Sequence, residues 1–539
     1  MPGKTTETIF INSVFGGLQS SRFFAGEGQY AAGIGFDPFM ALSDAVGDRL
    51  ASGVLRPTAY EDFSGANVNA DVIKIMTNPK DNNTYVVLKN GRLISYDNAL
   101  GTETLVGTVT GSNAEGAAYY NNYIYIFGTG ASNDDVSRYG PLDNSPSLTN
   151  GVWTGATLGT QTALVDTTYP AYRGGGTLPN HWAHVHVDNK LYFCDFKDGQ
   201  GQVHFIKTTK GTDEGDTDDG SVYGALDLPF GFMPTCIASL NNDIAVGAIQ
   251  TSDSDVDQGK AHLFLFDTTS ESFYAQIPVP DPLITALWNN NGVLHTFSGQ
   301  VSSGADVSNG YRVGAYLGGQ QITTQYLSEV GAPPLPGAIE DFGDMLIWGT
   351  FTQIPTTDPD NPEYFAVAMA MGTKSPQFPS GIHCIANSTA TATDADGMVT
   401  ALQIVQQDGF SHPKFIMGHR DSGGQGIDEM GTTYGTSVFR KSVSVGRKFS
   451  IERIRLNLGT AIDANMTITP TIFLDNYSSS STDGLTVIND TNYADSQRYV
   501  EFFPTISGQQ NFTLELRWSG SALLPVLLPI EIDFRIESD

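Results

Sequence analysis

The sequence predicts an all-β protein: a β-propeller of six or seven blades, a β-sandwich that follows it, and an irregular N-terminal arm. Short runs of Val, Ile, Tyr and Phe alternate with clusters of Asn, Asp and Gly, and a hairpin pattern recurs at a ragged interval of about 50 residues. After the last repeat, apolar and polar residues alternate more regularly, which is typical of strands with one buried face. The expected domains are residues 1–66 (arm), 67–430 (propeller) and 431–539 (sandwich).

The arm, residues 1–66, shows no sustained helical or strand period. It contains FGGL at 15–18, GEGQYAAGIGFDP at 26–38 and ASGVLRPTAYEDFSG at 51–65. A segment with so little core of its own must order against a neighbouring surface. We therefore expect it to dock on a partner or to close the propeller ring.

The propeller is predicted from one repeated element, an apolar stretch, a tight polar turn and a second apolar stretch. It is clearest in YVVLKNGRLISYD at 85–97, where Asn90-Gly91 predicts a type I′ turn. Further copies lie at 117–128, 183–195, 236–248, 284–299 and 338–349, with a weaker one at 389–405. WD and kelch signatures are absent, so the blades are divergent and their number stays open. An extended sandwich or a β-solenoid made of the same hairpins is the alternative.

The boundary before the sandwich is predicted within the Gly-, Ser- and Thr-rich stretch at 421–446. Three later segments each place their apolar residues on one face of a strand. These are Ile454, Leu456 and Leu458; Phe512, Leu514, Leu516 and Trp518; and Ile532, Phe534 and Ile536.

Composition excludes several classes of protein. The 539 residues carry 28 Lys and Arg against 58 Asp and Glu, a net charge of −30, which argues against a nucleic-acid binder and against an anionic membrane surface as partner. Three widely spaced cysteines form no disulfide framework and no metal knuckle. The longest apolar run, 522–530, is too short to span a bilayer, and the N-terminus lacks a signal-peptide pattern. We expect no membrane insertion and synthesis without Sec-type export.

One acidic loop is a candidate metal site. Asp253, Asp255 and Asp257 alternate before Gly259, and alternating carboxylates on a turning backbone can converge on Ca²⁺. The spacing departs from an EF-hand, which has Gly at the sixth position and Glu at the twelfth, where this chain has Phe264. A solvated acidic loop is the alternative, and shorter echoes lie at 216–220 and 394–397. No other cofactor is predicted.

No catalytic residue is predicted. His181, His184 and His186 lie in HWAHVH, where the last two share a strand face and could share a metal, but spacing places no third ligand. Strand histidines facing solvent or a channel are the alternative. HRDSGG at 419–424 echoes kinase and serine-protease motifs without their contexts, and its glycine pair is interpreted as part of the domain linker.

The leader motifs Gly16-Gly17-Leu18, Gly35-Phe36-Asp37-Pro38 and Leu55-Arg56-Pro57, which precede the first hairpin, resemble the opening of propeller-bearing virion proteins of tailed bacteriophages. The segment 448–476 resembles the β-sandwich that follows such propellers, and tail nozzle proteins of short-tailed phages have a comparable plan.

The resemblance implies a non-enzymatic structural component of a tailed-phage virion, associated with the tail as nozzle, tip or adaptor. It implies synthesis in the host cytoplasm, contacts with other virion proteins and a homo-oligomer, with no specific binding of nucleic acid. An acidic surface would also suit a tail channel through which DNA passes, because like charge repels phosphate.

The alternative function is a carbohydrate-binding or carbohydrate-cleaving propeller, either virion-borne or a bacterial surface adhesin, with a host surface glycan as partner. Exposed Trp and Tyr beside paired carboxylates at the central channel would favour it. The sequence singles out no such carboxylate pair.

Overall fold

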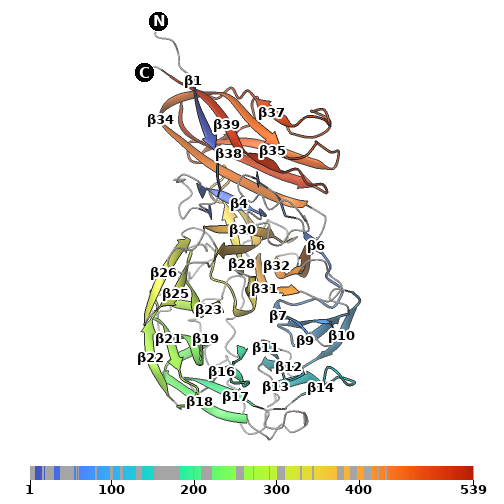
Figure 1. Ribbon diagram of the computed structural model, residues 1–539, viewed down its shortest axis with the longest axis vertical. Coiled ribbons are helices and arrows are strands. Elements are labelled where there is room, and N and C mark those ends of the chain that lie inside the picture. The colour runs from blue at the N-terminus through green and yellow to red at the C-terminus, as the bar shows by residue number, and fades with distance from the viewer. Residues whose placement is uncertain are drawn as a thin grey trace.

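The computed structural model is all-β, and the C-terminal domain lies at one end of its long axis, beside the rim of the propeller (Figure 1). Within the residues that it describes there is no α-helix, and none of their helical turns is long and apolar enough to cross a membrane. The described residues are 6–14, 17–18, 29–36, 54–55, 57–58, 60–78, 82–97, 101–109, 113–128, 136–150, 152, 182–197, 199–207, 221–250, 260–270, 272–290, 292–299, 310–317, 319–327, 331–342, 345–372, 381–388, 397–405, 414–421, 424–430 and 434–537.

Seven four-stranded antiparallel sheets form the propeller blades. Blades 1 to 3 are β7 (Val72–Thr77), β8 (Thr84–Leu88), β9 (Arg92–Tyr96) and β10 (Glu103–Thr108); β11 (Ala114–Tyr120), β12 (Tyr123–Gly128), β13 (Val136–Gly140) and β14 (Ser147–Thr149); and β15 (Ala183–Val185), β16 (Leu191–Lys197), β17 (Gln200–Ile206) and β18 (Ser221–Phe230). Blades 4 and 5 are β19 (Phe232–Leu240), β20 (Asp243–Gln250), β21 (Ala261–Phe266) and β22 (Phe273–Pro278); and β23 (Leu283–Asn290), β24 (Val293–Gly299), β25 (Tyr311–Leu317) and β26 (Gln320–Leu327). Blade 6 is β27 (Ile339–Phe342), β28 (Met345–Ile354), β29 (Glu363–Gly372) and β30 (Ile382–Asn387), and blade 7 is β31 (Met398–Val405), β32 (Lys414–Asp421), β33 (Gly424–Met430) and the arm strand β6 (Tyr60–Asp62).

The first strands of the seven blades form a closed inner ring. Each of β7, β11, β15, β19, β23, β27 and β31 contacts the next, and β31 returns to β7. The ring is sealed by the arm, because β6 pairs with β33 as the outermost strand of blade 7. The predicted propeller is thereby confirmed, with seven blades, and so is the expectation that the arm closes the ring.

Six of the predicted hairpins are present, with one correction at 85–97. Only Gly91 has a positive φ there, and it donates its main-chain N–H to Leu88 O, so the connection is a three-residue loop and not the predicted type I′ turn. At the next hairpin, both Asn121 and Asn122 have positive φ, as a type I′ turn requires. The weaker copy expected at 389–405 is not confirmed, because residues 389–396 lie outside the described residues and β31 pairs with the later strand β32.

The C-terminal domain is one sheet folded into two packed layers along its long strand β34 (Tyr434–Leu458). The first half of β34 pairs with β4 (Ala32–Ile34) and β38 (Gln509–Gly520), which continues to β35 (Met466–Leu474) and β36 (Ser479–Ser481). Beyond an irregularity between Ser444 and Phe449, the second half pairs with β37 (Tyr499–Phe502) and β39 (Val526–Ile536). The apolar faces predicted for these strands, such as Ile454, Leu514 and Ile532, are buried between the layers.

The arm adds strands to this domain as well as to the propeller. β1 (Thr6–Ile11) and β5 (Val54–Leu55) both pair with β39, while β2 (Gly17–Leu18) and β3 (Gln29–Tyr30) form a short parallel pair. Strands β2 and β4 contact β30, the outer strand of blade 6, and so cover an edge that would otherwise be free to pair with another chain.

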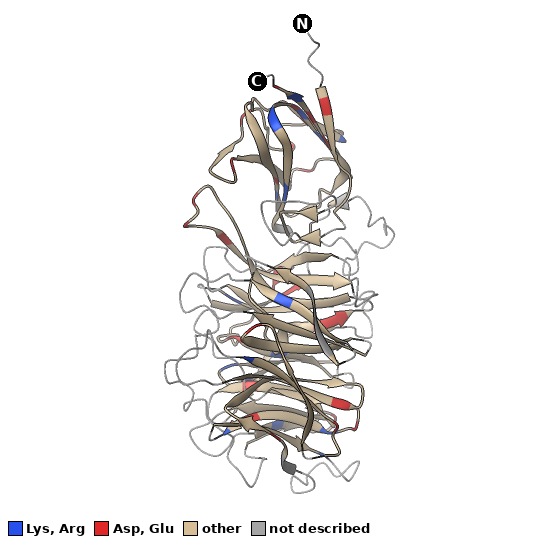
Figure 2. Cartoon of the chain, turned by 90° about the vertical axis from the view of Figure 1, so that its left-hand side faces the viewer, with Lys and Arg blue, Asp and Glu red and all other residues tan. Residues whose placement is uncertain are grey.

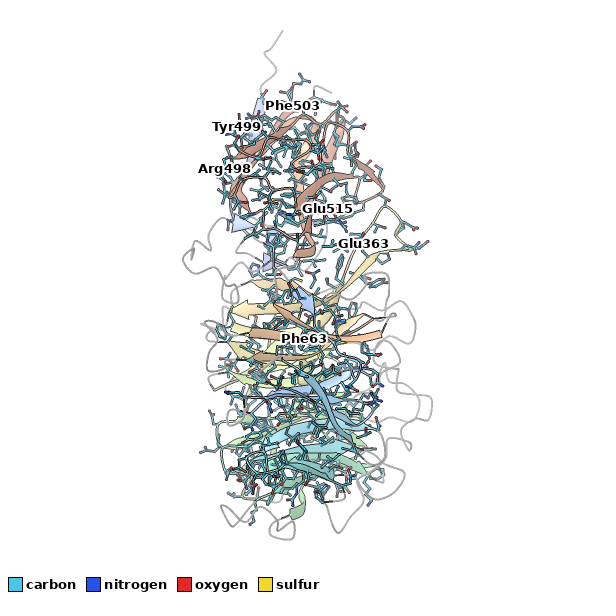
Figure 3. The ribbon with its side chains drawn as sticks, turned by 90° about the vertical axis from the view of Figure 1, so that its right-hand side faces the viewer. Phe63, Glu363, Arg498, Tyr499, Phe503 and Glu515 are labelled. Carbon is cyan, nitrogen blue, oxygen red and sulfur yellow. The ribbon has the colours of Figure 1, made fainter. Side chains whose placement is uncertain are left out.

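Polar contacts complete the junction between the domains. Phe36 donates its main-chain N–H to Cys384 O at 3.1 Å, and Thr58 Oγ1 donates to Ile385 O at 2.8 Å, so the arm is bonded to β30. Arg517 of β38 forms an ion pair with Glu363, at the start of β29, at 2.7 Å. Figure 3 labels Glu363 and, on the C-terminal domain near it, Glu515. The core is continuous across the junction, because residues of blades 5 and 6 belong to the same apolar cluster as the C-terminal layers.

The net charge is distributed unevenly between these parts. Residues 431–539 hold nine Lys and Arg against twelve Asp and Glu, whereas residues 1–430 hold 19 against 46. Both signs of charge occur on the C-terminal domain (Figure 2). Nearly all of the net negative charge therefore belongs to the part of the chain that contains the propeller.

Candidate functional site

The axis of the propeller is occupied by the connection between blades 5 and 6. The 3₁₀ turn η3 (Pro336–Ala338) is completely buried and contacts β7, β23 and β31, the inner strands of blades 1, 5 and 7. A side chain on Gly337 would lie 2.1 Å from Ile73 O and 3.2 Å from the Trp182 ring of blade 3. A segment that approaches inner strands on opposite sides of the ring must lie on its axis.

Three ionisable side chains from three inner strands gather beside this turn. Lys74 of β7 lies over the Trp182 ring, at 5.7 Å from its centroid, and interacts electrostatically with Glu340 of β27 and His184 of β15. All three side chains are half-buried. Within the described residues, Lys74 and Glu340 influence each other through space without a direct ion pair.

Burial shifts the pKa of each group toward its neutral form. It raises the pKa of Glu340 to about 7, although the nearby Lys74 opposes the shift. It lowers the pKa of Lys74, and it lowers the pKa of His184 to about 4, so this imidazole is neutral at physiological pH. The cluster therefore exchanges a proton near neutral pH through Glu340.

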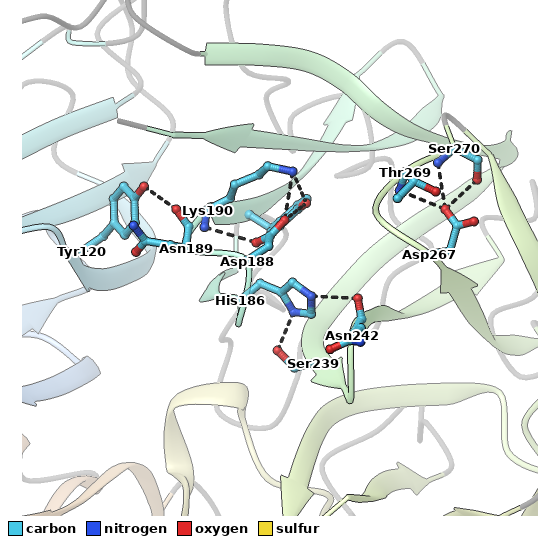
Figure 4. A network of polar contacts seen from close by, with 11 residues as sticks. Tyr120, His186, Asp188, Asn189, Lys190, Ser239, Asn242, Asp267, Thr269 and Ser270 are labelled. Carbon is cyan, nitrogen blue, oxygen red and sulfur yellow. Dashed lines mark hydrogen bonds and ion pairs between the residues drawn. The ribbon is translucent and has the colours of Figure 1, made fainter. Parts of the chain in front are cut away.

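His184 and His186 converge on one serine hydroxyl instead of on a metal. Their Nε2 and Nδ1 atoms lie 2.7 and 2.8 Å from Ser239 Oγ in blade 4, and His186 Nε2 lies 2.9 Å from Asn242 O; Figure 4 shows the contacts of His186. The sequence prediction that the two histidines share a strand face is thus confirmed. Their ring nitrogens form a hydrogen-bond network with Ser239 and Asn242 that joins blades 3 and 4.

The proton positions in this network follow from its acceptors. The Asn242 carbonyl only accepts, so a neutral His186 carries its proton on Nε2 and accepts at Nδ1 from the Ser239 hydroxyl. The Ser239 main-chain N–H donates to His184 Nε2 at 3.2 Å, and the same nitrogen lies 2.7 Å from Ser239 Oγ. No carboxylate orients either imidazole in these contacts, which distinguishes the network from a catalytic triad.

The other sequence candidates are located as follows. Asp253, Asp255 and Asp257 lie outside the described residues, as do His181 and the acidic segments 216–220 and 394–396. Within the described residues, no group of three or more His, Cys, Asp or Glu side chains is arranged to hold a metal ion.

The motif at 419–424 belongs to blade 7, and its interpretation as a domain linker is wrong. Asp421 and Gly424 are paired across the hairpin between β32 and β33, while His419 lies 3.3 Å from the buried Asp428. Arg420 reaches Asp71 of blade 1 at 2.7 Å, which adds an ion pair to the closure of the ring. Glu340 and Lys74 were not singled out by the sequence, because isolated charges in two distant strands carry no local signal of proximity.

The similarities of this chain to known proteins are structural and of low sequence identity. No family model and no curated protein matches the sequence. Among solved structures, the chain is similar to the computationally designed Ika8 protein (13% identity over 74% of this chain and 99% of that one, TM-score 0.37). It is also similar to the Neurospora crassa Pan2 WD40 domain (9% identity, 70% and 95%, TM-score 0.40) and to the Myceliophteria thermophila Cps50 (Swd1) β-propeller domain (10% identity, 69% and 100%, TM-score 0.39).

Proposed function

We propose that the chain is a non-enzymatic structural component of a tailed-phage virion, associated with the tail and assembled through contacts with other virion proteins. The observation that carries the proposal is the position of the leader motifs that resemble phage propeller proteins. Gly17 packs on the main chain at Ile382, and Gly35 packs against Asn387 and Ser437, both with positive φ. Phe36 bridges to Pro57 and bonds to blade 6.

The described residues of these motifs lie at the junction between the propeller and the C-terminal domain. Gly17 and Gly35 lie where a Cβ would collide with main-chain or side-chain atoms, so glycine is required by close approach. A chain whose leader joins its two parts through one continuous core is suited to carry load between neighbours, which is the task of a structural part. The support for the proposal is therefore the way in which the leader joins the two domains. It does not depend on a catalytic or ligand-binding site.

The charge distribution is compatible with DNA passing nearby. The part of the chain that contains the propeller is strongly acidic and would repel phosphate. Because η3 occupies the propeller axis, a DNA path in such an assembly would run between copies of the chain and not through one propeller.

The proposal is tested by locating the protein. Tailed particles purified from the host that carries this gene would be analysed by quantitative mass spectrometry and then by cryo-EM, with the map traced for this chain. We expect a fixed copy number in every particle and density that contains the propeller and the C-terminal domain. Absence from purified particles that are otherwise complete would refute the virion role.

One observation favours the alternative, a glycan-binding or glycan-cleaving propeller. Glu340 and Asp341 are adjacent carboxyls on an inner strand, and the half-buried Trp288 donates its indole N–H to Asp341 at 3.0 Å. Burial raises the pKa of both carboxyls, as it does for the general acid in sites that cleave glycosidic bonds. A glycan array and a reducing-sugar release assay, each with Glu340→Gln as control, test it. Binding or cleavage lost in that variant would support this function in place of the first.

A further inference from the structure

One face of the C-terminal domain has the composition of a contact surface. Four strands, β1, β39, the second half of β34, and β37, lie side by side in that order. Residues directly opposite one another on neighbouring strands point to the same side of a sheet. The register places Phe10, Glu531, Arg455 and Glu501 in one row across the four strands, while the alternating residues Ile9, Ile532, Ile454 and Phe502 face the other way, toward the core.

This outer face, defined by the row Phe10–Glu531–Arg455–Glu501 and its neighbours, is rich in exposed aromatic residues. Phe10 is 51% exposed, Tyr499 48% and Phe503 60%, three of the seven large apolar side chains exposed among the described residues. Tyr499 and Phe503 lie beside Arg498 at the end of the molecule away from the propeller (Figure 3). Aromatic residues and arginine are enriched at the centres of protein interfaces.

The arginines of the outer face differ in their partners. Arg453 forms ion pairs with three neighbouring carboxylates: Glu501 and Asp533 at 2.8 Å, and Glu531 at 3.8 Å. Arg455 lies between Glu501 and Glu531 in register, yet within the described residues it contacts only the Tyr499 ring, at 4.8 Å, and its Nε is buried without a partner. A half-buried guanidinium that has no ion-pair partner within the described residues and lies against an exposed aromatic ring is typical of a site completed by another molecule.

We propose that the outer face binds the same face of a second copy of the chain, related by a twofold axis. The face is self-complementary: Arg455 is flanked by a glutamate on each side, so a shift of one strand spacing, about 4.8 Å, puts each Arg455 opposite a carboxylate of the other copy. The inference does not rest on the virion role.

Electrostatics favour this geometry over other contacts between copies. Residues 431–539 are nearly balanced in charge, while residues 1–430 carry 19 positive against 46 negative side chains. The C-terminal domain lies at one end of the long axis (Figure 1), so a contact between two such domains is made by the parts of the chains whose charge is nearly balanced. Any contact through the propellers would bring like charges together.

The size of the face predicts weak association. Three strand spacings make the face about 14 Å wide, and five residues along a strand make it about 17 Å long. The area of the face is therefore smaller than the roughly 800 Å² that each partner contributes to a standard interface. The dissociation constant is therefore expected to be in the micromolar range or weaker.

Sedimentation equilibrium of the full chain over a concentration series tests the proposal. We expect a monomer–dimer equilibrium that added salt weakens, because salt screens the Arg455–carboxylate pairs across the interface. The variant Arg455→Glu with Tyr499→Ser is expected to raise the dissociation constant about tenfold or more. Lys260→Glu, which makes the same charge change at an exposed site on blade 4, is the matched control and should leave the dimer intact.

Three outcomes would overturn the proposal. The first is a monomer at every concentration and salt level tested. The second is a dimer that the Arg455 and Tyr499 changes leave unaffected while thermal unfolding shows both variants to be folded. The third is an association that grows beyond the mass of two chains as the concentration rises, which would point to docking of this face on a different surface, such as the propeller of the next copy.

Discussion

Arg440 is the side chain whose loss should most clearly loosen the junction between the two domains. It is 1% exposed, bonds Glu515 at 2.6 Å, donates to Pro355 O in the blade 6 connection at 2.5 Å, and lies over the Phe473 ring at 4.4 Å. Removing one partner of a buried ion pair costs about 3–5 kcal/mol. Because Arg517 still reaches Glu515 at 3.3 Å, we expect Arg440→Met to cost about 3 kcal/mol, at the lower end of that range.

Hydrogen exchange read by mass spectrometry measures this loss locally. A cost of about 3 kcal/mol corresponds to exchange roughly 100-fold faster in β34, β35 and β38, with blades 1 to 4 unchanged. The double variant Arg440→Met/Glu515→Leu removes both charges and should recover most of the protection, because no buried charge is then left alone. Exchange within threefold of the wild type in the single variant would refute this account of the junction.

Three further changes probe the axis of the propeller. Burial raises the pKa of Glu340 to about 7, so the folded chain binds a proton that the unfolded chain releases above about pH 4.5, and stability from this group falls as the pH rises through that window. At pH values above 7, Glu340→Gln should therefore unfold at a higher temperature than the wild type, and below pH 4.5 the two should unfold at nearly the same temperature. A difference in midpoint between variant and wild type that does not change with pH would contradict the reasoning. Ser239→Ala removes the hydroxyl that joins His184 and His186 and should cost about 1–3 kcal/mol in chemical denaturation, with Ser239→Thr as the milder control; equal stability of the alanine variant would exclude a role for the network. Gly337→Ala would place a Cβ 2.1 Å from Ile73 O and should lower the thermal midpoint by the equivalent of about 1–3 kcal/mol; an unchanged midpoint would show that η3 shifts without cost.

The charged cluster on the axis illustrates why the site was beyond prediction. Glu340 and Lys74 are separated by 266 residues, about half of the chain's length, and lie in unremarkable strand sequences. They interact only because a ring of seven blades brings blade 6 and blade 1 around a common axis. The histidine pair was accessible in part, since a two-residue spacing places both on one side of a strand, but its partner Ser239 lies in another blade.

The sequence by itself determined the local elements of this protein. Alternation placed Ile454, Leu514 and Ile532 on buried strand faces, and Asn-Asn at 121–122 specified a tight turn, because period and turn chemistry depend on adjacent residues. Only the tertiary structure decided which strands pair across long distances: β6 with blade 7, β1 with β39, and η3 on the axis. Those choices depend on burying each free edge and apolar face against a distant segment, and no local pattern encodes which segment will be the partner.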